Sequence, residues 1–216
     1  MLGIILCGGQ SLRMGSDKGL LTYQDKTWAQ LAGDKLHKLV IPVKISVNAV
    51  QQVTYTKHFS TEQLLADDAA IDMKGPLLGT LSAHMSAPEE DLFLLACDLP
   101  LITNRLLNII FDAYKTLHDY DAYIFNNAGK QEPLCGIYKS RGLKKILLMF
   151  QNNEIEKPSM KFVLQQLNVL ESRLSAADEQ FFNNFNFPSE MSPLVRRNAA
   201  RLISLKSAFS PSQSGH

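Results

Sequence analysis

The chain has 216 residues, of which 45% are hydrophobic and 20% are charged, and its formal net charge is +1. This length suits one large domain, or one domain with an appendage, and it is enough to bury a core without disulfides or metal staples. The near-neutral charge excludes a general polyanion binder, so no nucleic-acid partner is expected. No apolar stretch is long enough to span a bilayer, so no membrane partner is expected either.

The three cysteines, Cys7, Cys97 and Cys135, are odd in number and widely spaced. This pattern argues against a disulfide framework and against a zinc site. Each cysteine lies in or beside an apolar run, which predicts small buried thiols in a reducing compartment. The N-terminus lacks the basic start, long apolar stretch and cleavage site of a signal peptide. We therefore expect a cytoplasmic protein.

Short apolar runs alternate with segments of helical spacing along most of the chain. In chain order the pattern predicts a strand at 2–6, a helix at 28–40, strands at 43–48 and 63–68, a helix at 75–86, a strand at 91–100, a helix at 102–117, strands at 121–127 and 132–138, helices at 141–151 and 158–167, and strands at 168–172 and 181–187. Such alternation is typical of an α/β domain. We expect a three-layer Rossmann-like architecture with a mostly parallel central sheet and helices on both faces. Beyond this domain, at 191–216, the pattern predicts a short C-terminal helix and a flexible polar tail.

The segment CGGQSLRMGSDK (7–18) lies directly after the first predicted strand. In parallel sheets ligands bind at the carboxyl ends of the strands. Two adjacent glycines expose backbone N–H groups, Ser11 adds a hydroxyl, and Arg13 and Lys18 add positive charge, which together suit a polyphosphate. The spacing matches neither a P-loop nor a dinucleotide fingerprint. The alternative interpretation is a glycine-rich turn with solvated charges.

This segment also carries a resemblance to a known family. The string Leu6-x-Gly8-Gly9-x-Ser11-x-Arg13-Met14-Gly15-x-Asp17-Lys18 resembles the signature of the nucleotidyltransferases related to molybdenum cofactor guanylyltransferase. It departs only at Cys7, where the family more often has alanine, which is also small and apolar. The resemblance covers roughly residues 2 to 190 and implies a nucleotidyltransferase domain at 1–190. It implies that GTP contacts Leu6, Gly8, Gly9, Ser11 and Lys18, and that Arg13 and Lys18 are catalytic through their charge.

The motifs that follow the second and third strands occur in the order that the family shows. Asn48 follows the second strand, where the resemblance implies a position near the nucleoside. Asp68 follows the third strand, and its implied role is to accept hydrogen bonds from N1 and N2 of guanine. Gly75 would let the base or ribose approach the backbone closely. The alternative for Asp68 is a helix cap or turn acid, a role that Asp67 would equally fill.

Asp98 follows the fourth strand, within Cys97-Asp98-Leu99-Pro100. The resemblance implies that Asp98 contacts GTP, acts in catalysis and binds Mg²⁺. A carboxylate at a strand end suits this ion, because phosphate oxygens and water complete its octahedral shell. The alternative is an Asx turn before the proline.

Two later segments resemble the part of the family that binds the acceptor substrate. Pro133 and Leu134 match a Pro-Leu or Pro-Thr segment, and Asn184 and Asn186 match the Asn-x-Asn-x-Pro that closes the active site. A third segment, KPSMK at 157–161, would either present cations to an anionic group or form an ordinary capped helix start.

The reaction that the resemblance implies is transfer of GMP from GTP to molybdopterin, with release of pyrophosphate. The acceptor phosphate is already ionised near neutral pH, which explains why the five histidines lie outside all of these motifs. Catalysis would then consist of positioning and charge stabilisation. Gly8-Gly9 with Asp68 favours guanine over the CTP-dependent branch of the family. Two further hypotheses are transfer to a sugar phosphate or methylerythritol phosphate, and a non-catalytic nucleotide-binding protein of the same fold.

The expected partners are the substrates GTP and molybdopterin, with Mg²⁺ as cofactor. Any contact with other proteins of molybdenum cofactor synthesis is expected to be transient. The sequence does not determine the oligomeric state, and a monomer is the working expectation.

Overall fold

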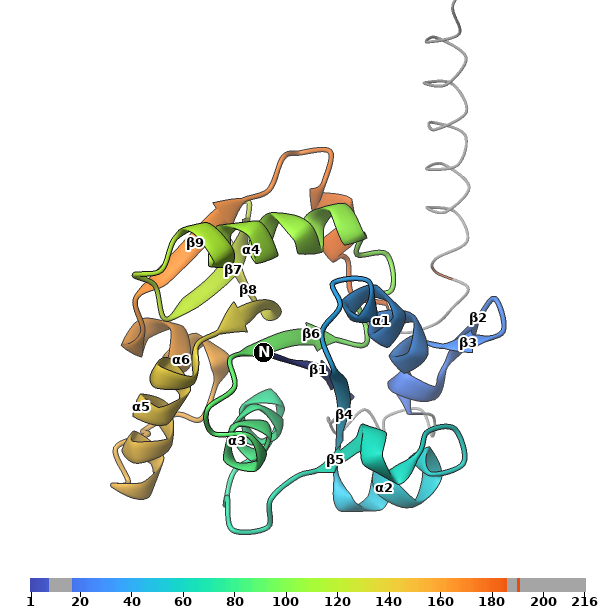
Figure 1. Cartoon of the computed structure of the whole chain (residues 1–216), viewed down its shortest axis with the longest axis horizontal. Helices are drawn as coiled ribbons and strands as arrows, with labels where there is room; N and C mark the ends of the chain where they lie inside the picture. Colours follow the sequence, from blue (N-terminus) through green and yellow to red (C-terminus); the bar gives the residue numbers. More distant parts are fainter. Residues whose placement is uncertain (8–16, 186–189, 191–216) are drawn as a thin grey trace, which may run out of the picture.

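The computed structural model describes residues 1–7, 17–185 and 190. A seven-stranded sheet crosses its centre in the order β5-β4-β1-β6-β8-β7-β9 (Figure 1). The strands are β1 (Leu2–Leu6), β4 (Val43–Val47), β5 (Leu64–Ala66), β6 (Leu92–Ala96), β7 (Ala122–Asn127), β8 (Lys130–Tyr138) and β9 (Val169–Arg173). The β1–β4, β1–β6, β4–β5 and β7–β9 pairs are parallel, whereas β8 runs antiparallel to both of its neighbours. The predicted mostly parallel sheet is confirmed.

Six α-helices surround the sheet in the described part of the chain. They are α1 (Trp28–His37), α2 (Ala49–Tyr55), α3 (Pro76–Ser86), α4 (Asn104–Thr116), α5 (Ser140–Gln151) and α6 (Met160–Gln166). Five of them coincide with predicted helices to within a few residues. Thr103 caps α4, since its side chain accepts a hydrogen bond from the backbone N–H of Leu106.

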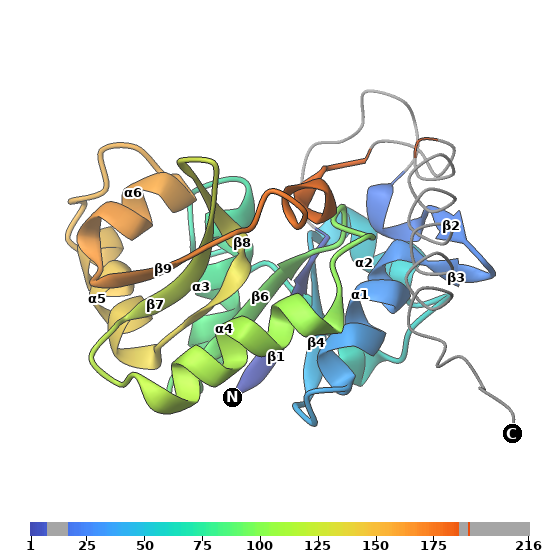
Figure 2. The same ribbon diagram turned by 90° about the horizontal axis from the view of Figure 1, so that it is seen from above.

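The two faces of the sheet bury separate cores. On β1, Ile5 belongs to the cluster that packs against α1 and α4, whereas Ile4 belongs to the cluster that packs against α3, α5 and α6. Both side chains are fully buried. Figures 1 and 2 show α4 on one side of the strands and α3 on the other. Because helices cover both faces, the central strands are apolar at nearly every position, and this is the signal that made β1 and β6 recognisable in the sequence.

The predicted strand at 181–187 is wrong over residues 181–185, and its last two residues lie outside the described part of the chain. Residues Glu179–Phe182 form a 3-10 helix, η4, and β9 is the last strand of the described sheet. Phe182 and Phe185 pack through their side chains instead of joining the sheet. The ring of Phe182 meets that of Phe125 edge-on, with the centroids 5.1 Å apart, and Phe185 packs with Trp28 in a small separate cluster. The aromatic residues therefore anchor the segment at two points.

The sequence pattern missed a β-hairpin and one α-helix. β2 (Thr22–Tyr23) and β3 (Lys26–Thr27) form a small antiparallel hairpin. The polar stretch after Asn48 contains α2, which is seven residues long. Tyr55 is its buried side chain, whereas its valines are exposed, so α2 has no apolar periodicity to reveal it.

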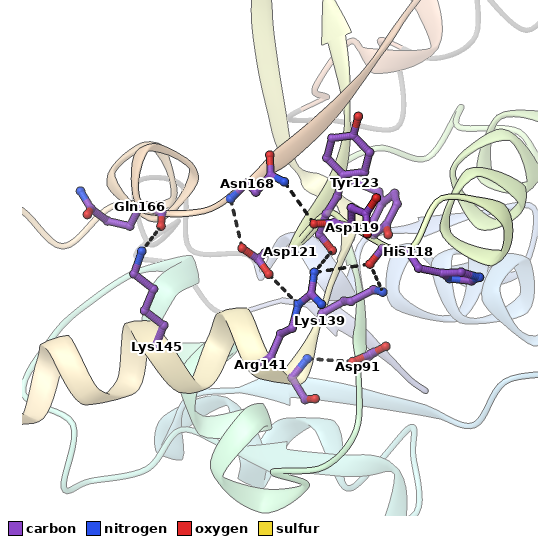
Figure 3. Close-up of polar contacts among 12 residues, drawn as sticks. Asp91, His118, Asp119, Asp121, Tyr123, Lys139, Arg141, Lys145, Gln166 and Asn168 are labelled. Atoms are coloured by element: carbon purple, nitrogen blue, oxygen red, sulfur yellow. Dashed lines mark hydrogen bonds and ion pairs between the residues drawn. The ribbon is translucent and has the colours of Figure 1, made fainter.

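A polar network closes the edge of the sheet at which β7 and β9 begin (Figure 3). The carboxylate of Asp121 accepts from Arg141 Nε at 2.7 Å and from the backbone N–H of Asn168 at 3.2 Å. Nearby, Asp91 accepts from the first backbone N–H of α5 at 2.8 Å. These contacts join α5 to the starts of β6, β7 and β9, at the edge opposite to the carboxyl ends of the parallel strands.

Replacing Asp121 with alanine is expected to lower the free energy of unfolding by about 1–2 kcal/mol, because a backbone N–H and a guanidinium lose their acceptor. The measurement is urea denaturation of the two proteins. Asp112→Ala is the matched control, since Asp112 forms an exposed pair with Lys115 at 2.7 Å and should lose less than about 0.5 kcal/mol. Equal midpoints for the two variants would contradict a stabilising role for the network.

Within the described ranges, every helix is too short or too polar to cross a membrane. The segment at 191–216, predicted to be a short helix and tail, lies outside these ranges. The division of the chain at residue 190 therefore stays a prediction.

Candidate active site

The carboxyl ends of four parallel strands, β1, β4, β5 and β6, meet at one edge of the sheet. The register pairs Leu6 with both Ser46 and Ala96, so that β1, β4 and β6 end at the same level. Residues that directly follow these strands must therefore lie along this edge. Those predicted from the sequence and described by the structure are Asn48, Asp68 and Asp98. Four others in the first loop, Gly8, Gly9, Ser11 and Arg13, lie outside the described residues, as does Asn186.

Lys18 and Asp98 meet at this edge although they are 80 residues apart in the chain. Lys18 begins the 3-10 helix η2 (Lys18–Leu20), and its Nζ lies 3.4 Å from Asp98 Oδ2. The two side chains are 24% and 23% exposed, so both remain open to a ligand. The arrangement places a cation for phosphate oxygens directly beside a carboxylate that suits a divalent metal.

The turn that carries Asp98 is held from two sides. Lys35 of α1 donates to the carbonyl of Pro100 at 2.6 Å, and burial lowers the pKa of this lysine to about 8. From the other side, the backbone N–H of Phe185 donates to the carbonyl of Asp98 at 3.3 Å. The structure thus brings Asn184, the neighbour of Phe185, next to the Asp98 turn. The segment that ends at Phe185 and the turn after β6 therefore lie next to each other.

Asn48 sits at the expected edge, where it caps α2. Its Oδ1 accepts from the backbone N–H of Gln51 at 2.9 Å, and Gln51 Oε1 accepts from the backbone N–H of Asn48 at 2.9 Å. This reciprocal capping box occupies the oxygen of the Asn48 side chain. The amide nitrogen is the part of the side chain left to meet a nucleoside.

The two neighbouring acids after β5 have different surroundings. Asp68 Oδ1 accepts from the backbone N–H of Ala70 at 2.8 Å, which is the turn role that competes with guanine recognition. Asp67 Oδ1 is buried and has no hydrogen-bond partner among the described residues, and burial raises the pKa of this carboxyl to about 6. Asp67 faces Gly79 of α3, where a Cβ would lie 3.6 Å from its Oδ1.

Gly75 precedes α3 and adopts φ +79°, a conformation that favours glycine. A Cβ at this position would meet nothing within 4 Å, so the backbone is open to an approaching molecule. Pro76 begins α3, where its missing N–H is not needed by the helix. Both the exposure and the backbone conformation suit the close approach that the sequence predicts.

Pro133 and Leu134 lie at a break in the pairing of β8 with β7. Ile124 pairs with Gly136, whereas the next residue, Phe125, pairs with Glu132, so the residues between bulge out of the ladder. Proline is tolerated at such a bulge because it has no N–H to donate. Since β8 runs antiparallel, this bulge lies near the carboxyl end of β6, on the same edge as Asp98.

Other polar side chains on this edge were not predicted from the sequence. Glu171 of β9 accepts from Gln131 Nε2 at 2.6 Å and from Asn126 Nδ2 at 2.5 Å, and these bonds lower the pKa of its carboxyl. Asp17 is likewise held by two side chains of α2. The position of Asp17 next to Lys18 could have suggested a role for it from the sequence. No sequence pattern indicates its partners on α2, Gln51 and Tyr55.

The described residues contain no cluster of three or more His, Cys, Asp and Glu side chains that would hold a metal by themselves. All three cysteines are free and buried, as predicted.

Comparison with known proteins shows the family to which the chain belongs. The family model of the MobA-like NTP transferase domain matches residues 3–169. A probable molybdenum cofactor guanylyltransferase from Geobacillus sp. (strain WCH70) is 29% identical over 199 residues, which cover 90% of this chain and 98% of the relative.

Two solved structures share the fold. Molybdopterin-guanine dinucleotide biosynthesis protein A from Archaeoglobus fulgidus superposes with a TM-score of 0.70 at 16% identity, covering 89% of this chain and 96% of the other. Rv0371C from Mycobacterium tuberculosis H37Rv, solved in complex with manganese, has a TM-score of 0.55 at 14% identity, covering 80% and 87%. The family model spans well over half of the chain, from β1 to the start of β9, and the chain belongs to the MobA-like NTP transferase family.

Proposed function

We propose that the chain is a molybdenum cofactor guanylyltransferase, which transfers GMP from GTP to the phosphate of molybdopterin and releases pyrophosphate. The observation that carries the proposal is the Lys18–Asp98 pair, 3.4 Å apart at the carboxyl ends of parallel strands, in a chain of this family. The name of the Geobacillus relative supports the choice of nucleotide and acceptor.

The nucleotide would lie along the edge formed by β1, β4, β5 and β6. Lys18 would bind the triphosphate with Arg13 and the backbone of the loop that follows Leu6, while Asn48 and Gly75 would face the nucleoside. Asp68 would read guanine through Oδ2, because its Oδ1 is already engaged in the turn to Ala70. Oδ2 has more than one lone pair, so it would accept from both N1–H and the N2 amino group of guanine, which are adjacent donors.

The residues present fit a magnesium ion shared with the substrate. Asp98 offers one partly exposed carboxylate, and Mg²⁺ is commonly held by one or two carboxylates together with substrate phosphates. When bound, the ion would neutralise charge on the α-phosphate and on the departing pyrophosphate. Manganese in a solved structure of the same fold supports a divalent metal.

The acceptor would approach from the side of β8 and the segment before residue 186. Pro133, Leu134, Asn184 and Asn186 would orient molybdopterin so that its phosphate oxygen attacks the α-phosphorus of GTP in line. The new P–O bond forms as the bond to the β-phosphate breaks, and pyrophosphate leaves. No general base is required, because the attacking phosphate is already ionised, so the task of the protein is positioning and charge stabilisation.

We also propose a cellular compartment and an oligomeric state for the enzyme. The three buried free cysteines support a reducing compartment, which we take to be the cytoplasm. We propose that its partners are its substrates, GTP and molybdopterin, and that the enzyme is a monomer.

The experiment that tests the function is a thermal-shift panel with Mg²⁺ and one nucleotide at a time, followed by a transfer assay with molybdopterin. At a hundredfold excess over Kd, GTP should stabilise the protein by about 2.7 kcal/mol, which raises Tm by roughly 5–10 °C for a chain of this size. CTP, ATP and UTP should give little shift, and Asp68→Asn should reduce the preference for GTP. A shift with CTP alone would move the chain to the cytidylyl branch. Binding of GTP without any transfer would favour a non-catalytic nucleotide-binding protein.

A further inference from the structure

Asp17 accepts several hydrogen bonds beside the proposed active site. Its Oδ1 accepts from Tyr55 Oη at 2.8 Å and from the backbone N–H of Gly19 at 3.0 Å. Its Oδ2 accepts from Gln51 Nε2 at 2.6 Å. All three donors are uncharged. The carboxylate is therefore stabilised by dipoles, and the neighbouring Lys18 is directed toward Asp98 instead.

The partners of Asp17 are themselves firmly placed on α2. Gln51 takes part in the capping box with Asn48, and its Nε2 also donates to the carbonyl of Cys7 at 3.0 Å. Tyr55 is completely buried, and its ring stacks on Phe59 with the centroids 5.8 Å apart. Burial raises the pKa of Tyr55, so its hydroxyl remains a hydrogen-bond donor at all working pH values. One helix thus binds both the end of β1 and the residue before Lys18.

The residue after Lys18 is equally constrained. A Cβ at Gly19 would collide with Tyr55 Oη and would lie 2.9 Å from Cys7 Sγ. The backbone on the C-terminal side of Lys18 therefore lies directly on the tyrosine hydroxyl. Tyr55 fixes the main chain on both sides of the lysine, by contact with Gly19 and by its hydrogen bond to Asp17.

We propose that Asp17, Gln51 and Tyr55 form a positioning unit that holds Lys18 against Asp98 and the triphosphate. The proposal rests on the proposed function. It gives these three residues a role in that reaction although they do not themselves touch the substrate. A lysine side chain is a flexible four-carbon stem, so its ammonium is well placed only when its backbone is fixed. Small displacements of a group that stabilises developing charge are costly to the rate.

The test compares two tyrosines that each donate to an aspartate. Tyr55→Phe removes the bond to Asp17, and Tyr114→Phe removes the bond to Asp91, which is 2.7 Å long and lies at the opposite edge of the sheet. Both variants should lose similar thermal stability. Tyr55→Phe should lower kcat for GMP transfer roughly tenfold with a smaller change in KM, because the lost contact acts on the transition-state charge. Tyr114→Phe should keep the wild-type kcat.

A second variant tests the same positioning role in case Tyr55→Phe does not fold properly. Gln51→Glu keeps the oxygen that caps α2 but replaces the donor to Asp17 with an acceptor, so it should also lower kcat by about tenfold or more. Wild-type kcat in both Tyr55→Phe and Gln51→Glu, or equal losses in Tyr55→Phe and Tyr114→Phe, would overturn the positioning role.

A binding measurement separates this proposal from the proposed function. Calorimetry with magnesium tripolyphosphate reports the contact of Lys18 with phosphate without any transfer reaction. The affinity should fall several-fold in Tyr55→Phe and stay unchanged in Tyr114→Phe. If the wild type transfers no GMP but this difference persists, the positioning unit stands and the function falls. If transfer is normal and both variants bind like the wild type, the positioning unit falls alone.

Discussion

Replacing Asp98 with alanine is expected to lower the rate of GMP transfer by about three orders of magnitude, with Tm close to the wild-type value. Asp98 is the carboxylate proposed to hold the metal. It follows β6, a strand that is buried along its whole length, so the backbone at this position should not shift to bring another carboxylate to the metal. The Lys18–Asp98 pair is 3.4 Å long and partly exposed, so breaking it should cost the fold little.

The measurement is single-turnover release of pyrophosphate over a range of Mg²⁺ concentrations. If Asp98 binds the metal, Asp98→Ala should need a higher Mg²⁺ concentration for half-maximal rate, and its rate at saturating Mg²⁺ should stay below that of the wild type. Asp112→Ala on α4 is the matched control, because it removes a partner of a lysine far from the edge and should leave the rate unchanged. A rate within about threefold of wild type in Asp98→Ala would remove this residue from the mechanism.

Replacing Lys18 with alanine is expected to reduce transfer by about 10²–10³-fold, the usual effect of deleting one group that stabilises developing charge. The loss should appear mainly in kcat if Lys18 acts on the departing pyrophosphate, and in KM if it only binds GTP. Thermal denaturation should show a folded protein, since the side chain is partly exposed and its backbone contacts are made through Asp17 and Gly19.

Lys26→Ala is the appropriate comparison, because Lys26 pairs with Asp34 at 2.5 Å on the surface and has no place in the proposed mechanism. Lys18→Arg should recover only part of the rate, since a guanidinium keeps the charge but differs in shape and reach. Full activity in Lys18→Ala would be incompatible with the proposed phosphate-binding role.

The succession of strands and helices along the chain was predictable because each central strand is buried on both faces of the sheet. β1 and β6 are continuous apolar runs, and any polar residue that follows such a run must lie at the carboxyl edge of a parallel sheet. That rule, together with the family resemblance, singled out Asn48, Asp68 and Asp98, and the glycine-rich string after β1 indicated a phosphate site. The predicted strand at 181–187 is wrong over its described part, where Phe182 contacts Phe125 and Phe185 packs with Trp28, and no local pattern specifies these contacts.

The partners within the site were not predictable in this way. Asp17 is 34 residues from Gln51 and 38 from Tyr55, and α2 carries no apolar periodicity. The different surroundings of Asp67 and Asp68 also depend on how α3 packs over β5, through Gly79 and Ser82. Hydrogen bonds between distant residues depend on the packing of whole elements, which the sequence shows only indirectly.

The sequence by itself determined the α/β architecture and the family resemblance, and it predicted the edge of the sheet at which we propose the active site. Local patterns of apolar residues indicate which strands are buried, and buried parallel strands end at one edge of the sheet. The tertiary structure alone decided that Lys18 meets Asp98, that Phe185 reaches the same turn, and that Tyr55 holds Asp17. Each of these contacts joins residues tens of positions apart, and their geometry exists only once the helices have packed against the sheet.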